Sequence, residues 1–191
     1  MKFSKVKTLI LAALMLIISP ISNAITLQRL GLDDMTQRAD KVFRGVVVDI
    51  EQTSISVGGG ELPVVRYRLK VSEQLKGSAD VVKGEDSFIE IKMVGSIKPA
   101  VPRTDGLVRL NFMQDIPKLQ MGSDYVLFTT PRSSAGLSTM VGLGQGAFDV
   151  NMVEKQEMVL NQYGNSNIDQ AGGKPMSYQS LKQAVTTAMA N

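Results

Sequence analysis

The chain has 191 residues, with 21 lysine and arginine residues against 18 acidic ones, and it contains no histidine, cysteine or tryptophan. The absence of imidazole and thiol groups excludes a Ser-His-Asp triad, a cysteine nucleophile, an HExxH zinc site and any disulfide. A chain of this length can bury a core, so we expect one domain that is stabilised by packing.

The N-terminal segment, residues 1–24, has the three parts of an export signal. Lys2, Lys5 and Lys7 form a positive start, and residues 22–24 end in a small residue suited to signal peptidase. The apolar run between them has about ten residues, half of the roughly 20 that span a bilayer. We therefore predict cleavage between Ala24 and Ile25, a periplasmic or secreted location in a bacterium, and no membrane span in the mature chain.

Removal of the export signal also changes the charge. The three lysines are lost with it and no carboxylate is, so 21 basic residues become 18, against 18 acidic ones. Binding to nucleic acid needs a clustered excess of cations, which a neutral chain lacks. We therefore expect no nucleic-acid partner.

A helix and a long strand are predicted next. Residues 26–39 space their apolar side chains as one face of a helix, with Asp33 and Asp34 in its first turn. Residues 41–57 are β-branched and apolar on both faces near Val46 to Val48, which indicates a long central strand. The glycines at 58–60 then form a loop.

Residues 62–77 alternate between apolar and charged side chains, the pattern of a strand with one buried face. The apolar side consists of Val65, Tyr67, Leu69 and Val71. The other side carries a stripe of three cations, Arg66, Arg68 and Lys70, roughly 13 Å long because alternate strand residues lie about 6.6 Å apart. The stripe is a candidate contact for an acidic partner or anionic lipid. A charged outer face also protects a strand against edge-to-edge aggregation.

Four further strands are predicted at 87–95, 123–130, 137–142 and 147–153, and residues 157–164 fit either a strand or a helix. Residues 96–120 contain three prolines, so any strand there, around 107–110, is short or at an edge.

The C-terminal part is predicted to contain a loop and a helix. Residues 163–176 are polar and rich in glycine, which indicates a flexible surface loop. Ser177 can cap a final helix over 177–191, in which apolar residues recur every three or four positions.

Three glycines alternate in GLGQGAF, residues 142–148. A phosphate-binding glycine loop opens a helix, whose N-terminal N–H groups hold the anion, whereas the residues after this motif have the pattern of a strand. We therefore interpret the motif as a bulge or tight bend between two strands. As a loop it is also a candidate binding element, formed by Gly142, Gly144, Gln145 and Gly146.

Other chemistry is poorly represented. Residues 25–191 contain no SxxK and no GxSxG motif. The neighbouring acids at 33–34 and 85–86 are interpreted as a helix first turn and a solvated turn. Asn165, Asn167 and Asp169 alternate as in a calcium loop, but no bidentate glutamate follows. We predict no catalytic residue, no metal ligand and no cofactor.

Strands in the middle and one helix at each end are typical of a mainly β fold, a small barrel with helical closures, and not of alternating βαβ units. Three motifs, at 39–47, at 67–77 and at 122–128, resemble the netrin-type module, whose family includes the tissue inhibitors of metalloproteinases. A group of exported bacterial proteins of unassigned function is also similar, and its pattern continues into 141–150. The resemblance implies an OB-like, partly open Greek-key barrel of about five to seven strands over residues 25–162.

The animal inhibitors of that family block zinc proteases with a disulfide-anchored N-terminal cysteine, and this chain has no cysteine. We expect a non-enzymatic exported protein that contacts a protein partner, with a protease or another envelope protein as candidates. The alternative is a periplasmic barrel that binds a small molecule or a glycan between the loops at 58–60 and 142–146. No sequence pattern specifies an oligomeric state.

Overall fold

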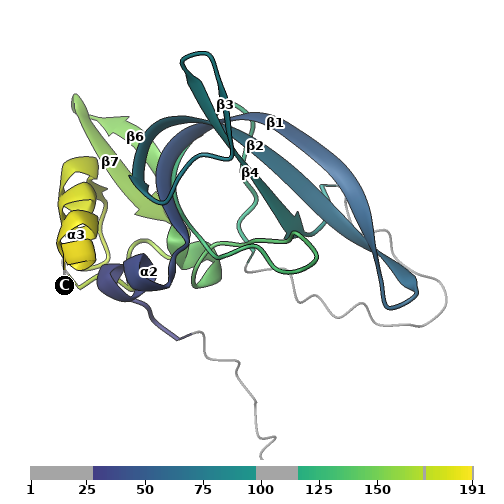
Figure 1. The fold of residues 1–191 in the computed structure, drawn as a ribbon. Coiled ribbons are helices and arrows are strands. Elements are labelled where there is room, and N and C mark those ends of the chain that lie inside the picture. Colours follow the sequence, from purple (N-terminus) through teal and green to yellow (C-terminus); the bar gives the residue numbers. More distant parts are fainter. Residues whose placement is uncertain (1–27, 98–115, 170, 191) are drawn as a thin grey trace, which may run out of the picture.

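The computed structural model of the protein describes residues 28–97, 116–169 and 171–190. These residues form one open sheet of eight antiparallel strands, in the order β3-β4-β2-β1-β5-β6-β7-β8, together with two α-helices (Figure 1). A mainly β fold, with a short helix near the N-terminus and another at the C-terminus, is therefore confirmed. Closure of the sheet into an OB-like Greek-key barrel stays a prediction.

In chain order the elements are α2 (Leu32–Arg38), β1 (Lys41–Val57), β2 (Gly60–Lys76), β3 (Val81–Lys83), β4 (Asp86–Val94), β5 (Asp124–Thr129), the 3₁₀ helix η1 (Leu143–Gly146), β6 (Ala147–Val153), β7 (Gln156–Asn161), β8 (Met176–Ser177) and α3 (Tyr178–Ala190). The sheet has more strands than the predicted five to seven. Strands β3 and β8 have only 3 and 2 residues, too few for a period-two pattern. The predicted export signal, its cleavage point and the strand around 107–110 lie outside the described residues.

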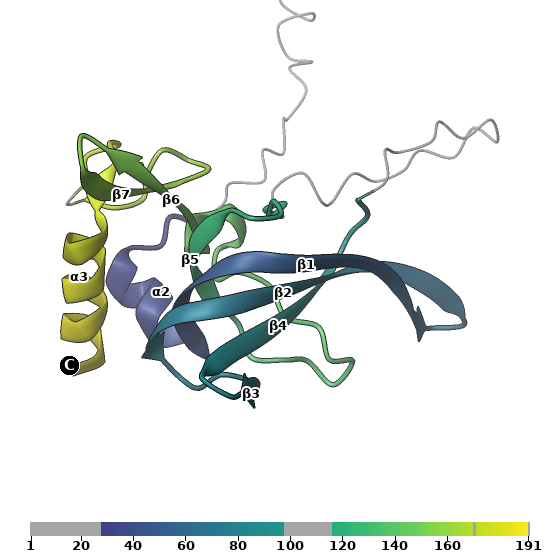
Figure 2. The same cartoon turned by 90° about the horizontal axis from the view of Figure 1, so that it is seen from above.

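The centre of the sheet is a long hairpin. Strands β1 and β2 have 17 residues each and pair from Val42 to Val57. Gly58 and Gly59 form the two-residue turn between them, and both have positive φ angles (59° and 79°), which a type I′ hairpin turn requires. Beyond the part of β1 that pairs with β5, the hairpin extends as an arm (Figures 1 and 2).

Two hydrophobic clusters lie on opposite faces of β1 and β5. One contains Val42, Val126 and Phe128 and joins the sheet to α2 and α3. The other contains Phe43 and Leu127 and joins β1 and β5 to β2 and β4. Because strand side chains alternate between faces, neighbouring residues of β1 and β5 contribute to different clusters. The start of β1 is therefore buried on both faces. The sequence placed this feature a few residues later, near Val46 to Val48, where Val48 is in fact 42% exposed.

The C-terminal helix forms as predicted. The Ser177 hydroxyl accepts a hydrogen bond from the Ser180 N–H (3.1 Å), the geometry of an N-cap. One face of α3 is buried and packs with α2 at one end of the sheet (Figure 2): Tyr178, Leu181, Val185 and Ala188. In the described residues, no helix has the length and apolar character needed to cross a membrane.

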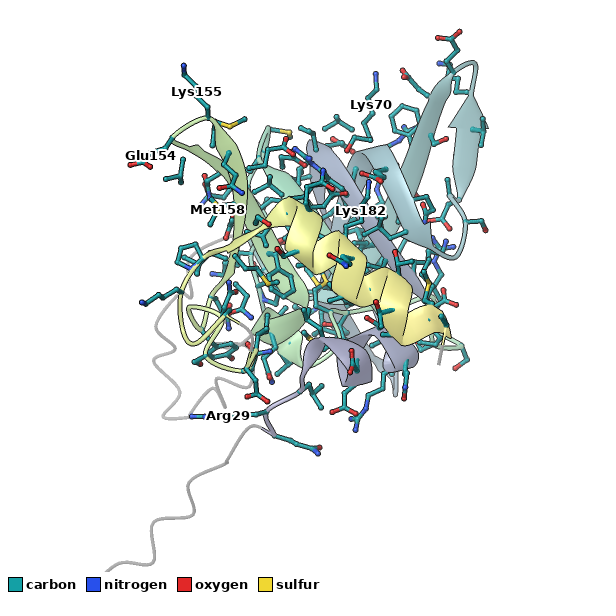
Figure 3. All side chains as sticks on the ribbon, turned by 90° about the vertical axis from the view of Figure 1, so that its left-hand side faces the viewer. Arg29, Lys70, Glu154, Lys155, Met158 and Lys182 are labelled. Carbon is teal, nitrogen blue, oxygen red and sulfur yellow. The ribbon has the colours of Figure 1, made fainter. Side chains whose placement is uncertain are left out.

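The segment that was ambiguous between strand and helix is strand β7, which pairs with β6 from Asn161 to Gln156. The turn that joins them consists of Glu154 and Lys155, both with positive φ angles (48° and 66°). Their side chains project from the tip of the hairpin (Figure 3). Left-handed conformations are uncommon for residues other than glycine, asparagine and aspartate, so this turn is strained.

Candidate functional site

The outer face of the sheet is the face that carries Arg44, Arg66, Arg68 and Lys70, opposite the buried side chains of Tyr67 and Leu69. At one end of the sheet α2 and α3 pack on this face, with α3 over Arg44. None of the described helices packs over the part formed by Arg66 to Lys70, and Lys70 points away from the sheet (Figure 3). The outer face therefore has a helix-covered part and an uncovered part.

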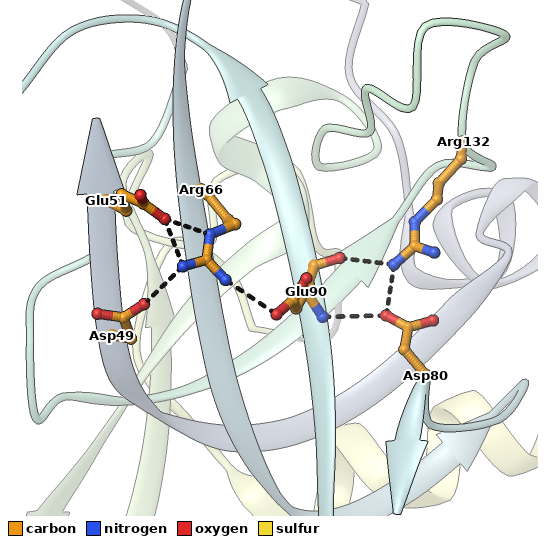
Figure 4. Close-up of polar contacts among 6 residues, drawn as sticks. All are labelled: Asp49, Glu51, Arg66, Asp80, Glu90 and Arg132. Atoms are coloured by element: carbon orange, nitrogen blue, oxygen red, sulfur yellow. Dashed lines mark hydrogen bonds and ion pairs between the residues drawn. The ribbon is translucent and has the colours of Figure 1, made fainter. Parts of the chain in front are cut away.

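In the uncovered part, Arg66 is surrounded by three carboxylates (Figure 4). Its guanidinium donates to Asp49 (3.1 Å) and Glu90 (3.0 Å), and Nε donates to Glu51 (2.8 Å). The hydrogen bond with Glu51 raises the pKa of Arg66 above its ordinary value. Arg66 lies within the predicted cationic stripe, but its charge is neutralised inside the chain.

Lys70 is also paired, although more loosely. Its ammonium lies 2.7 Å from a carboxylate oxygen of Asp86, and the two side chains are 51% and 46% exposed. An ion pair so open to water contributes little to stability, because solvent screens both charges. Lys70 can therefore exchange Asp86 for another acidic group at low cost.

Arg68 is the unpaired cation of the stripe. Its guanidinium lies over the Phe88 ring, 4.5 Å from the centroid. No carboxylate among the described residues forms an ion pair with it, and its buried Nε atom has no hydrogen-bond acceptor there. Asp49 and Glu90 are its cross-strand neighbours, but both turn to Arg66.

Apolar side chains border this arginine. A bulge in β1 places Val48 and Asp49 opposite Arg68, and Val48 is 42% exposed. On the other side, Val81 of β3 pairs with Phe88 and is 43% exposed. We call this group of four residues the Arg68 patch: Val48, Arg68, Phe88 and Val81. It combines an aromatic ring, an arginine and two exposed valines. Phenylalanine and arginine are both enriched at protein interfaces.

The helix-covered part contains a second arginine over an aromatic ring. The guanidinium of Arg44 lies 4.7 Å from the centroid of Tyr178, on α3. Unlike Arg68, it also donates to two carboxylates, Asp124 (2.9 Å from Nε) and Glu157 (2.9 Å from Nη1). Hydrogen bonding with Glu157 raises the pKa of Arg44, and the same contact lowers the pKa of Glu157.

Two further contacts attach α3 to the sheet beside Arg44. Tyr178 donates its hydroxyl to Glu73 (2.7 Å), and the Lys182 ammonium lies 2.6 Å from the other oxygen of that carboxylate. The hydrogen bonds from Lys182 and then Tyr178 lower the pKa of Glu73. Burial and the contact with Glu73 raise the pKa of the Tyr178 hydroxyl.

The free edge of β4 is covered by side chains and one loop. Asp80 accepts the Glu90 N–H (2.9 Å) and binds Lys41, while Arg132 donates to Asp80 (2.6 Å) and to the Glu90 carbonyl oxygen (3.0 Å) (Figure 4). Burial alone would raise the pKa of Asp80, but the hydrogen bonds from Lys41 and the Glu90 N–H outweigh it and lower the pKa. These contacts protect an edge that is otherwise open to pairing with another strand.

A small polar pocket of about 150 Å³ lies at the same edge, lined by Glu90, Lys92, Arg132 and Gly136. One backbone hydrogen bond, from the Ser138 N–H to the Lys92 carbonyl oxygen (2.9 Å), ties the loop after β5 to β4 here. The pocket is smaller than the roughly 300–1,000 Å³ typical of small-molecule sites.

The glycine motif lies in the interior and is not a bend between two strands. Residues 143–146 form the 3₁₀ helix η1, and the strand predicted at 137–142 is reduced to a single bridge between Met140 and Thr129. Gly142 starts the turn with a φ of 63°. A Cβ atom on Gly146 would lie 2.5 Å from the Val141 carbonyl oxygen, so close packing requires glycine there.

Gln145 is 2% exposed, and its amide holds the backbone that precedes α2. Its Oε1 accepts the Leu30 N–H (2.9 Å) and its Nε2 donates to the Gln28 carbonyl oxygen (2.9 Å). Asn167 donates to the Leu30 carbonyl oxygen (2.7 Å). We call Gln145 and Asn167 the amide cradle. Of the predicted binding residues, the glycine loop thus faces residues 28–30, whereas the three cations lie on strand β2.

The alternating asparagines form part of the same interior network. The Asn165 side-chain oxygen accepts the Asn161 N–H (2.9 Å), and the Asn167 oxygen accepts the Asn161 side-chain N–H (2.8 Å). These oxygens are occupied by donors, which explains the alternation without a calcium ion. Asn165 and Ile168 are almost fully buried, so the segment predicted as a flexible surface loop carries part of the core. In the described ranges, no group of three or more acidic residues is placed to hold a metal.

Comparison with protein-family models found no match to this chain, and comparison with curated proteins found none either.

Proposed function

We propose that the protein is an exported, non-enzymatic binding protein that contacts a protein partner through the uncovered part of its outer face. The observation that carries this proposal is the Arg68 patch. It presents an aromatic ring and an unpaired arginine between two exposed valines, on the part of the outer face that no described helix covers. Phenylalanine and arginine are both enriched at protein interfaces relative to the rest of the protein surface.

The state of the surrounding acidic residues supports binding over catalysis. Asp49, Glu51 and Glu90 are ion-paired with Arg66, and Asp86 is paired with Lys70. A general acid or base must reach the substrate with a free carboxyl group, and these carboxylates are occupied by cations of the same chain. The export signal and the netrin-type resemblance, both of them predictions from sequence, point in the same direction.

A protein partner fits the shape of this region better than a small molecule does. The Arg68 patch lies on a strand face, whereas small ligands are enclosed in concave sites. A periplasmic barrel that binds a small molecule or a glycan is the second candidate, and the pocket at the β4 edge is the feature that favours it.

The test is site-specific photo-cross-linking in the bacterium that produces the protein. A benzophenone side chain replaces Lys70, which borders the Arg68 patch, and in a matched control it replaces Gln183, an exposed residue of α3. We expect a protein adduct of one defined mass from position 70 and none from position 183. Equal adducts at both positions, or none at position 70, would contradict a protein-binding function for this face.

A further inference from the structure

We infer that Arg68 binds a carboxylate of the partner, so that the partner presents an aspartate or glutamate flanked by apolar side chains. This inference rests on the proposed function and adds the chemistry of the partner to it. It follows from a comparison between two arginines of the same sheet face.

Arg44 and Arg68 have the same aromatic support. Their guanidinium carbons lie 4.7 Å and 4.5 Å from the ring centroids of Tyr178 and Phe88. A ring under the guanidinium plane fixes its orientation and leaves the N–H groups at its edge available to an acceptor in the same plane. At Arg44 that edge is occupied by two carboxylates, Asp124 and Glu157. In the described chain, the equivalent edge of Arg68 has no carboxylate.

Acidic residues are present around Arg68, but they are committed elsewhere. Asp49 and Glu90 face it from β1 and β4, but both accept hydrogen bonds from Arg66, two residues away. Asp86, at the start of β4, is paired with Lys70. A carboxylate that accepts hydrogen bonds from Arg68 must therefore come from outside the described part of the chain.

The surroundings of Arg68 select the type of acceptor. Guanidinium and carboxylate groups form two parallel hydrogen bonds, which gives a planar, bidentate contact. Val48 and Val81 lie on either side of the arginine and are partly exposed, so the groups next to that carboxylate contact apolar surface. An acidic residue within an aliphatic strand or turn satisfies both conditions. The surface thus fits an acidic-aliphatic segment of a protein.

The first test uses a defined probe, the peptide acetyl-Val-Glu-Val-Glu-Val-amide, and its counterpart with glutamine in place of glutamate. Binding to the mature protein is followed at low salt by the NMR signals of the arginine side-chain N–H groups. We expect the glutamate peptide to bind at least about tenfold more tightly than the glutamine peptide, and to shift the Arg68 signal and not the Arg44 signal. Arg68→Gln should remove this preference while the backbone spectrum and melting temperature stay unchanged.

A second variant keeps Arg68 and removes its competitor. Arg66→Gln releases Asp49 and Glu90, which face Arg68 across the strands and should then pair with it. We expect this variant to lose the preference for the glutamate peptide as well, although the binding arginine is intact. A preference that survives Arg68→Gln would overturn the inference, as would Arg68-dependent binding to phosphatidylglycerol vesicles without binding to the peptide.

The cross-linking experiment separates this inference from the proposed function. Arg68→Gln is introduced together with the benzophenone at position 70, and the yield of the protein adduct should fall at least about tenfold. If the adduct forms equally well with Arg68→Gln, a partner binds this face but does not use Arg68, and only the inference fails. If no adduct forms with Arg68 present, the proposed function itself fails.

Discussion

The helix-covered and uncovered parts of the outer face contain the same pair of groups in different surroundings. Each contains an arginine stacked on an aromatic ring, Arg44 on Tyr178 and Arg68 on Phe88. In the covered part, α3 and two carboxylates complete the arrangement, and the contacts join distant segments of the chain. In the uncovered part, no carboxylate of the described residues accepts a hydrogen bond from Arg68. The two stacks therefore differ in one respect: among the described residues, the chain supplies carboxylates to Arg44 and none to Arg68.

The largest difference between the two parts should appear in hydrophobic truncations. Leu181 of α3 is fully buried against the helix-covered part, so Leu181→Ala should lower the free energy of unfolding by about 2–5 kcal/mol. The matched change Val81→Ala, in the Arg68 patch, should alter it by less than about 0.5 kcal/mol. Urea unfolding of both variants measures the contrast. Equal losses would show that the Arg68 patch is part of the structural core.

The arginines themselves give the next largest effect. Arg44→Gln leaves Asp124 and Glu157 without a cation beneath α3, and should cost about 1–3 kcal/mol of unfolding free energy. Arg68→Gln removes no ion pair of the described chain and should stay within about 0.5 kcal/mol of the parent. Chemical unfolding at neutral pH measures both values. A large loss for Arg68→Gln would mean that this arginine serves the fold and not a partner.

Substitutions at the tip of the β6–β7 hairpin should raise the free energy of unfolding, whereas the changes above lower it or leave it unchanged. Glu154 and Lys155 hold left-handed backbone angles, and Asn-Gly is the sequence that such a two-residue turn prefers. The double change Glu154→Asn and Lys155→Gly should raise the free energy of unfolding by about 1 kcal/mol. Thermal and urea unfolding would detect it. The matched change in the β1–β2 turn, Gly58→Ala, should destabilise, because that residue has a φ of 59°.

The smallest expected effect is the pH dependence of stability that comes from Glu73, in the helix-covered part. The pKa of Glu73 is lowered in the folded state by Lys182 and Tyr178. Its contribution to stability is therefore present above the ordinary glutamate value of 4.5 and is lost as the pH falls through the lower folded value. Glu73→Gln should make the unfolding free energy less sensitive to pH below about 4.5. An unchanged acid dependence in this variant would show that Glu73 does not attach α3.

Local patterns predicted most of the strands. The alternation in 62–77 gave strand β2 and the side on which each residue lies, because side-chain direction repeats every two residues. The partners of Arg66 come from β1 and β4, and which carboxylate faces which arginine depends on register and on the bulge at Val48. Register is a property of strand pairing, so the sequence showed a stripe of three cations where the fold contains one unpaired arginine.

The interior polar groups were harder to recognise. Gln145 and Asn167 are polar residues of a kind that is typical of loops. Their burial is explained only by hydrogen bonds with Leu30, which lies far away in the sequence. The glycines around Gln145 were interpreted as a bend and a candidate binding loop, whereas in the structure they allow close packing. One residue in the polar segment 163–176 could have indicated its burial. Ile168 is apolar, and an apolar residue in such a segment indicates contact with the core.

The amide cradle also has a consequence for the order in which the molecule assembles. The bonds from Leu30 to Gln145 and from Asn167 to Leu30 span 115 and 137 positions of the chain. Ribosomes produce Leu30 first, and the two side chains that hold it are made 115 and 137 residues later. Contacts of such long range slow folding, since a large loop must close before they form. Helix α2 should therefore dock only after residues 145 and 167 have been made, and fragments that end before residue 145 should leave it undocked.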